Sequence, residues 1–395
     1  MKESIRFFFI VLIISAYACS SQGDGSVSIV EVNGGKMAVF SLDNLKSDTA
    51  TILLSNLVEN CSFVQLETND EAFFKPWFTT VTEKYIGVRN QSGPYKLFSR
   101  SGKFLCNIGS RGQGPGEYAL TPYDDIIDDR NELVYLAPFM GANILVYNIL
   151  GQFIKNIAAP ERLNKAKLYL SGDVLTVFHM AFGNSRAIAY QFDVNTGQVL
   201  NELTPPEHFL VQNFDGEIFN TRNAPGTFDF QHSSSDTLYY FDIENNRINP
   251  LFTATYSASE PFKQYCILNE HVILTHVMVL ENNSETGRPG FVSKGLVATD
   301  LKIKTSSYIK VVNDYYGNMP VAAGISTLRN GYYVYNIQPE QLMDDLKNQL
   351  SQSRMTDNDR QTLNQTLSSL QENTNNVVFI GKLRQEFKPE FRDWQ

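Results

Sequence analysis

The chain has 395 residues and a net charge of −9, with 43% hydrophobic and 12% aromatic residues. This composition is typical of a globular protein, and the length allows one large domain or two ordinary ones. The acidic balance argues against nucleic acid or an anionic lipid surface as the main partner, because phosphate binding is driven by clustered Lys and Arg.

Residues 1–19 have the pattern of an export signal. Basic residues precede an apolar run over 7–14, which is too short to cross a bilayer as a helix. The ending SAYAC resembles the signal of bacterial lipoproteins, in which the cysteine after the cleavage site carries the lipid, although Ala16 stands where that family usually has Leu. The resemblance predicts lipidation of Cys19. The alternative is an ordinary signal peptide cleaved close to this residue, and both versions export the protein.

Beyond the signal, the chain divides into a short tether and a long body. Residues 20–26 are small and polar, which is typical of a flexible tether, so the body over 27–395 is expected to work close to a membrane surface. The body contains three cysteines, none in C-x-x-C spacing. We expect Cys61, Cys106 and Cys266 to be buried thiols, with a Cys61–Cys106 disulfide as the alternative.

Short runs of alternating apolar and polar residues, each closed by Gly, Asn or Asp, recur along the body. They predict antiparallel strands joined by hairpins. The clearest unit spans residues 95–109, and its plan returns at intervals of roughly 40 to 50 residues, the period of a β-propeller blade. The matching points of the repeat are Phe98, Tyr147, Tyr190, Tyr240, Thr299 and Phe379. Six points predict an all-β, six-bladed propeller; a two-sheet sandwich or several separate β modules are the alternatives.

Two segments lie outside this repeat. Residues 36–67 are expected to supply strands that close the ring against the last strands of the chain, because an open propeller would leave two unpaired sheet edges. Residues 339–372 carry leucines at helical spacing on both sides of a polar turn, which predicts a helical hairpin inserted in the last blade. We expect the hairpin to cover an exposed end of the propeller; a partner-docking surface is the alternative.

The stretch RGQGPGEY at residues 111–118 invites comparison with phosphate-binding loops. It does not fit a Walker loop, because Pro115 and Gly116 stand where Lys and Ser or Thr are required. Its glycines tolerate positive φ and its proline restricts φ, so a compact corner between two blades is expected. In that corner Glu117 would accept backbone N–H groups, while Tyr118 packs beneath the turn. The residues expected to build it are Gly112, Gly114, Pro115, Gly116, Glu117 and Tyr118.

Several segments together resemble the six-bladed propeller lipoproteins of Bacteroides and their relatives, which have an NHL/TolB-like fold. They are GKFLCNIGSRGQGPGEY, DDIIDD at 124–129, NILVYNILGQFIKNI, LVENCSFVQLET at 57–68, and NTNNVVFIGKL, in which Asn376 stands where a proline is expected. In that family the GPGEY segment lies between the first and second blades. The resemblance covers nearly all of the mature chain and implies the fold, while it says almost nothing about activity.

Candidate chemistry is sparse. His179 and His232 are placed near strand ends, where propeller loops meet at the central channel, and with Arg222 and Asp229 they could form a polar cluster at one mouth of that channel. The chain contains no G-x-S-x-G sequence, and 124–129 lacks the glycine and the spaced acids of a calcium loop. We therefore expect no cofactor and no metal site.

Aromatic residues are the enriched class, with 27 Phe and 19 Tyr. Most are expected to fill the wedges between blades. Trp77, Phe139, Tyr315 and Tyr316 fall in predicted loops and could instead stack on sugar rings or on apolar groups of a partner.

The preferred interpretation is an exported, lipid-anchored propeller of the cell envelope, without enzymatic activity, that binds or scaffolds a glycan, a peptide or a protein partner at one face of the ring. The alternative is a propeller lyase or hydrolase that uses His179, Arg222, Asp229 and His232. Converging histidines and acids at a channel mouth would favour the enzyme, and an aromatic rim without them would favour the binding protein.

Overall fold

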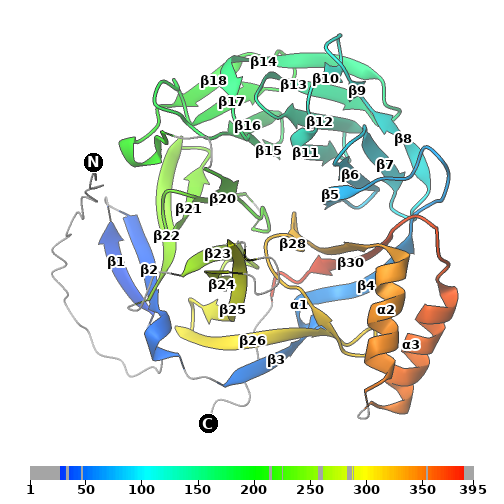
Figure 1. Cartoon of the computed structure of the whole chain (residues 1–395). Helices are drawn as coiled ribbons and strands as arrows, with labels where there is room; N and C mark the ends of the chain where they lie inside the picture. The colour runs from blue at the N-terminus through cyan, green and yellow to red at the C-terminus, as the bar shows by residue number, and fades with distance from the viewer. Residues whose placement is uncertain are drawn as a thin grey trace.

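The computed structural model describes residues 27–386 except 33–34, 46–47, 213–215, 225, 257–260, 283–286, 288 and 353–354. The predicted signal over 1–19 with Cys19, and the tether over 20–26, lie outside the described residues. The described chain forms six blades arranged in a ring, each built on four antiparallel strands, which confirms the predicted all-β, six-bladed propeller (Figure 1).

The first three blades follow one another along the chain. Blade 1 consists of β5 (Pro76–Val81), β6 (Tyr85–Asn90), β7 (Tyr95–Ser99) and β8 (Phe104–Ile108). Blade 2 consists of β11 (Pro122–Asp128), β12 (Leu133–Pro138), β13 (Gly141–Asn148) and β14 (Phe153–Leu163). Blade 3 consists of β15 (Lys167–Ser171), β16 (Val174–Phe178), β17 (Ala189–Asp193) and β18 (Val199–Leu203).

The other three blades each gain strands from the N-terminal part of the chain. Blade 4 consists of β19 (Ile218–Phe219), β20 (Phe228–His232), β21 (Thr237–Asp242) and β22 (Arg247–Thr255). Blade 5 consists of β23 (Phe262–Ile267), β24 (Val272–Asn282), β25 (Pro289–Asp300), β26 (Thr305–Asn313) and the short β27 (Met319–Val321). Blade 6 consists of β28 (Leu328–Arg329), β29 (Tyr332–Ile337), β30 (Val377–Leu383) and β4 (Val58–Gln65).

The six matching points of the sequence repeat all lie on the third strand of a blade, which is β7, β13, β17, β21, β25 or β30. Like the second strand, this strand is hydrogen-bonded on both edges within its sheet, where apolar and β-branched residues are favoured. The repeat was therefore detectable because it follows an inner strand of each blade.

The N-terminal segment closes the ring and also wraps around it. β4 pairs antiparallel with β30, with Phe63 opposite Phe379, so the first and last parts of the chain share blade 6. Before that, β1 (Ser28–Val32) and β2 (Gly35–Ser41) extend blade 4, and β3 (Thr49–Leu53) extends blade 5. β2 and β3 both pair in parallel with the outermost strand of the repeat, so these two strands add to complete blades (Figure 1). A four-residue helix, α1 (Leu54–Leu57), connects β3 with β4.

Large apolar side chains fill the spaces between neighbouring blades. Between blades 3 and 4, Phe178 packs against Phe228 and Phe230, and the Phe178 and Phe230 ring centroids lie 4.3 Å apart. Flat rings suit such sheet-on-sheet contacts because they fill a thin wedge with a large apolar area. Aromatic side chains thus fill the wedges between blades, as the sequence predicted for most of them.

The helical insertion lies between β29 and β30 and consists of α2 (Pro339–Leu350) and α3 (Asp357–Ser369). Leu342, Leu346 and Leu363 are fully buried in the apolar cluster shared by blades 5 and 6. Asp359 donates its main-chain N–H to the Thr356 hydroxyl at 3.1 Å, which caps α3. The hairpin covers the outer edge of the ring at these blades (Figure 1). No helix in the described ranges combines the length and the hydropathy needed to span a membrane.

The glycine-rich stretch 111–118 lies where the chain crosses from blade 1 to blade 2. β9 (Ser110–Arg111) and β10 (Glu117–Tyr118) pair in parallel across it. The Glu117 carboxylate accepts the N–H of Gly114 at 2.8 Å, and Gly116 has a φ of +72° that a side chain would disfavour. The buried Tyr118 donates its hydroxyl to the last carbonyl of β8 at 2.9 Å. The geometry is that of a corner held together by its own side chains.

The three cysteines of the body are free thiols, so the alternative Cys61–Cys106 disulfide is not formed. Cys61 lies on β4 in blade 6 and Cys106 on β8 in blade 1. Burial raises the pKa of Cys106 to about 11 and, with a smaller opposing hydrogen bond from Asn313, that of Cys61 to about 12. Protonated, partly buried thiols of this kind behave as small apolar groups.

Candidate functional site

One mouth of the ring gathers side chains from strands that are far apart in the sequence. Each blade begins with a strand at the axis, and the pairing register places the start of this first strand beside the end of the second. Pro76 lies opposite Asn90 in blade 1, and Gln264 lies opposite His276 in blade 5. The start of every first strand and the end of every second strand therefore face the same mouth.

A cluster of charged side chains from five blades meets at this mouth, and we call it the axial cluster. Most of its members are buried, and four cations lie among three acids. The axial cluster consists of Arg89, Asp124, Asp125, Lys167, Glu217, Arg222 and Arg329.

Asp124, at the start of β11, is the centre of the axial cluster. Its carboxylate lies 3.1 Å from Arg222 Nη1, 3.6 Å from Arg329 Nη2 and 3.8 Å from Arg89 Nη2. It also accepts the main-chain N–H of Leu168 at 2.8 Å, which ties blade 2 to blade 3. Burial by itself would raise the pKa of Asp124, but the three guanidinium groups outweigh it and lower this pKa to about 2. One buried carboxylate thus holds cations from blades 1, 4 and 6.

The other acids of the axial cluster are also engaged. Asp125 lies 3.0 Å from Arg89 Nε and accepts the Tyr95 hydroxyl at 2.9 Å. Glu217 accepts the Tyr123 hydroxyl and lies 3.4 Å from Lys167 Nζ. Burial lowers the pKa of Lys167 to about 8, because removing water from the ammonium group disfavours its charged form. The acids of the axial cluster thus all form ion pairs or hydrogen bonds with neighbouring cations and hydroxyls.

Aromatic rings surround these charges. The Phe78 ring lies under two guanidinium groups, with its centroid 4.4 Å from Arg89 Cζ and 5.0 Å from Arg329 Cζ. Tyr123 contacts both Trp77 and Phe139, at centroid distances of 5.4 Å and 5.3 Å. Trp77 remains 41% exposed. An aromatic rim therefore borders the charged centre of the mouth.

Two of the four aromatic residues for which stacking on a ligand was the alternative to packing lie at this rim, namely Trp77 and Phe139. Tyr315 and Tyr316 do not, because both pack against the apolar cluster of blades 5 and 6. The Tyr316 and Phe379 ring centroids, for example, lie 5.0 Å apart. Sequence context alone could not separate these cases, since all four residues fall beside turn-forming neighbours.

The four predicted site residues occupy three different environments. Arg222 belongs to the axial cluster, and Asp229 accepts the main-chain N–H groups of Thr221 and Arg222 at 3.0 Å and 2.7 Å. These bonds hold Arg222 at a φ of +57°, with its side chain directed at Asp124. Asp229 thus positions Arg222 through the backbone.

The two histidines lie apart from this pair. His179 is fully buried, 3.8 Å from Glu161, and its ring stacks on Tyr190. His232 bonds to the Ser234 hydroxyl at 2.7 Å and contacts Phe209. Burial lowers the pKa of His179. Burial and the neighbouring His208 lower the pKa of His232 to about 4. In the described part of the chain no hydrogen bond or ion pair joins either histidine to Arg222 or Asp229, and no set of His, Cys, Asp and Glu side chains could hold a metal ion.

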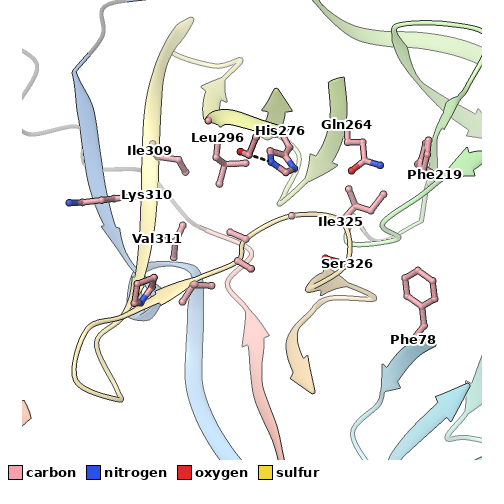
Figure 2. A pocket seen from close by; sticks show the side chains of 17 residues that line it. Phe78, Phe219, Gln264, His276, Leu296, Ile309, Lys310, Val311, Ile325 and Ser326 are labelled. Carbon is pink, nitrogen blue, oxygen red and sulfur yellow. Dashed lines mark hydrogen bonds between the residues drawn. The ribbon is translucent and has the colours of Figure 1, made fainter. Parts of the chain in front are cut away.

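A cavity of about 610 Å³ opens beside the axial cluster, and we call it the blade 5 pocket (Figure 2). One row of side chains across four strands forms its floor, because the register aligns Gln264, His276, Leu296 and Ile309 on one face of blade 5. The connection over 320–326 forms a second wall.

Figure 2 shows Phe78 and Phe219 on the side of the pocket opposite to Ile309, while Lys310 points away from it. The lining is mostly apolar, with few polar groups. His276 Nε2 and the Ser293 hydroxyl lie 2.9 Å apart and supply two of them. This size and this lining are typical of small-ligand and peptide side-chain pockets. Phe78 connects the pocket with the axial cluster, since its ring also contacts Arg89 and Arg329.

Sequence reasoning did not find this pocket. Its residues come from β23 to β27, from the connection to β28, and from single phenylalanines of blades 1 and 4. The one local signal was the run PVAAGIS at 320–326, which is apolar and small and has no clear strand or helix period. Its first two residues end β27, and the rest forms neither strand nor helix.

Comparisons with known proteins agree with this architecture. A Bacteroides fragilis protein described as exported has a similar structure, with a TM-score of 0.59 at 14% sequence identity, over 88% of this chain and 99% of that one. A member of the DUF4221 family from Bacteroides vulgatus has a TM-score of 0.46 at 11% identity, over 92% of this chain and 99% of that one. The likeness to the Bacteroides fragilis protein concerns the fold alone. No curated protein matches the chain. The family model described as "Domain of unknown function (DUF4934)" matches residues 37–382, and the chain therefore belongs to the DUF4934 family.

Proposed function

We propose that this protein is a lipid-anchored binding or scaffolding module of the cell envelope, without enzymatic activity, that recognises a glycan, a peptide or a protein partner at the axial mouth. The observation that carries the proposal is the blade 5 pocket, a largely apolar cavity of about 610 Å³ that opens between the aromatic rim and blade 5. Pockets with this balance of apolar walls and few polar groups are typical of binding sites.

The electrostatics of the mouth support binding over hydrolysis or elimination. A general acid or base needs a titratable group that can reach the substrate with a pKa near the working pH. Asp124 is buried under three guanidinium groups, and its pKa is about 2. His179 and His232 are buried in separate blades, with pKa values lowered by burial. The pKa of Lys167 is about 8, but its ammonium group is largely buried and lies 3.4 Å from the Glu217 carboxylate. The mouth therefore presents mainly rings and an apolar cavity to a ligand.

The pocket can be tested by filling it. Gly324 lines the pocket, and a Cβ at this position meets no atom within 4 Å, so Gly324→Trp should fold normally and occupy the cavity. We expect this variant to capture the wild-type ligand from envelope fractions roughly tenfold less efficiently or worse, a factor equivalent to about 1.4 kcal/mol. Quantitative mass spectrometry of proteins and glycans that co-purify after cross-linking measures the effect.

Gly183→Trp is the matched control, because Gly183 is an exposed loop residue of blade 3 whose added Cβ would come no closer than 3.8 Å to another side chain. It should capture the same ligand as the wild type. Equal capture by the Gly324→Trp and wild-type proteins would contradict the assignment of the pocket.

Membrane attachment is tested separately. If Cys19 carries a lipid, cells fed an alkyne-labelled fatty acid should incorporate the label into the wild-type protein and not into the Cys19→Ser variant, and the variant should leave the membrane fraction. A dual-acylated N-terminus anchors stably because each buried CH₂ contributes about 0.8 kcal/mol. Cys61→Ser, which leaves the signal untouched, should label like the wild type. Label that persists in Cys19→Ser would argue for an ordinary signal peptide.

A further inference from the structure

The sheet of blade 5 splits into two arms beside the pocket. β25 pairs with β26 only from Leu296 to Asp300. Its first half, 289–295, continues along β24 alone. A register shift between Val277 and Met278, together with a φ of +141° at Gly295, marks the point of separation. The first arm of this fork is therefore the outer part of the β24–β25 hairpin.

The second arm consists of the end of β26 and β27. Val311 and Asn313 pair with Val321 and Met319. β3 already occupies the other edge of β26, and a strand has only two edges. β27 must therefore lie on the edge that β25 has left, so the fork opens between β25 and β27.

The free strand edges of the fork border the pocket. Ser293 and Gly295 of β25 line it from one arm, and Pro320 and Val321 of β27 line it from the other. Among the described residues, those at 289–294 form ladder pairs with β24 only, and most of them are exposed. The outer edge of this half of β25 therefore presents main-chain N–H and C=O groups that are available to another strand.

An apolar stripe leads from the pocket along the first arm. Leu280 and Phe291 face each other across β24 and β25, and they are 63% and 58% exposed. The Phe291 ring contacts Phe262 at a centroid distance of 4.9 Å, and Phe262 contacts the pocket residue Phe219 at 6.1 Å. Two charges of this arm, Lys294 and Glu281, neutralise each other at 2.6 Å. The described part of the arm thus offers an exposed apolar pair beside a free backbone edge.

We propose that the fork of blade 5 binds an extended polypeptide segment with alternating apolar side chains. The segment adds to the free edge of β25 as an extra strand, places one apolar side chain in the blade 5 pocket, and lays another on Leu280 and Phe291. A polypeptide is the occupant because donors and acceptors repeating at strand spacing are matched by another extended main chain, and alternate side chains then enter pockets on one face. The inference rests on the proposed function and names the ligand class of the same pocket.

The test uses the mature full-length protein and a random linear heptapeptide library. We expect enriched peptides to alternate apolar and polar residues and to bind Gly324→Trp poorly. In a synthetic copy of one such peptide, N-methylation at alternate positions should weaken binding roughly tenfold or more, because each methyl removes an N–H donor to the β25 edge. N-methylation at the intervening positions should leave the affinity unchanged, because their N–H groups point away from that edge. Titration by fluorescence anisotropy measures both series.

A matched pair of variants tests the apolar stripe. Phe291→Ser should weaken peptide binding, whereas Ile154→Ser, at a 50% exposed position on β14 of blade 2, should leave it unchanged. Circular dichroism and thermal unfolding of both variants show whether they fold like the wild type.

Two results would overturn the inference. One is a library that yields no peptide preferring the wild type over Gly324→Trp. The other is a peptide affinity that falls equally whichever position of the peptide is N-methylated. If either occurs while Gly324→Trp still loses its ligand from envelope fractions, the pocket remains a binding site and only the peptide assignment fails. Equal envelope capture by Gly324→Trp and the wild type would instead remove the proposed function itself.

Discussion

Replacing Asp124 by Asn should lower the free energy of unfolding by about 3–5 kcal/mol, the usual cost of removing one partner from a buried ion pair. The substitution keeps the size of the side chain and removes the charge that Arg89, Arg222 and Arg329 share. The three guanidinium groups then lie close together at the axis without the carboxylate that neutralises them. Urea unfolding followed by circular dichroism measures the loss.

Asp70→Asn is the control, because Asp70 is an exposed turn residue, and it should change stability by no more than about 0.5 kcal/mol. A similarly small effect for Asp124→Asn would contradict the central role of this carboxylate.

The same carboxylate should make stability depend on pH at the acid end. The arginines outweigh burial and lower the pKa of Asp124 from 3.8 to about 2 in the folded protein. A pKa that is lower in the folded than in the unfolded state stabilises the fold fully above about pH 4, and this contribution disappears as the pH falls to about 2. The stability difference between the wild type and Asp124→Asn should therefore shrink over this interval. A difference that stays constant from pH 5 to pH 2 would contradict the assignment.

Gly381→Val should weaken the closure of the ring. A Cβ at Gly381 would lie 2.7 Å from the carbonyl oxygen of Asn60 and 2.8 Å from Val58, so β4 must move away from β30. Overpacking of this kind costs about 1–3 kcal/mol, and here it acts on the strand that joins the two parts of the chain in blade 6. We expect a loss near the upper end of this range, with faster hydrogen exchange in β4 than in β6.

Gly290→Val is the matched control, since a Cβ at Gly290 meets no atom within 4 Å. It should leave stability nearly unchanged or raise it slightly, because valine restricts the unfolded chain more than glycine does. Uniform exchange across all blades in Gly381→Val would show that ring closure does not depend on this contact.

The fold was predictable because its signals are local. A strand shows its alternation within a few residues, and a blade shows its turns within about 50 residues. The points Phe98, Tyr147, Tyr190, Tyr240, Thr299 and Phe379 therefore located all six third strands. The helical hairpin was equally visible, since Leu342 and Leu346 lie one turn apart on α2. The pairing of β4 with β30 followed from the need to avoid open sheet edges.

The positions of β2 and β3 were not predictable in the same way. Both pair in parallel with the outer strands of complete blades, and no rule of ring closure requires this. Their partners β22 and β26 are distant in sequence, so the pairing depends on which edges the finished ring leaves free. The fork of blade 5 has the same origin, because β3 occupies one edge of β26 and thereby assigns β27 to the other.

The candidate site depended almost wholly on tertiary structure. Arg222 and Asp229 were predicted site residues that do lie together. Asp124 was noted only within the segment 124–129, where a calcium loop was excluded, and Phe78 was not singled out, although both define the mouth. A propeller brings one short strand start from each blade to its axis, so side chains become neighbours through the closure of the ring and not through their spacing in the chain. The sequence by itself determined the repeating strands, the hairpin insertion and the ring they imply, because those depend on short-range alternation; only the folded ring decided which charges neutralise one another at the axis and where a ligand-sized cavity remains.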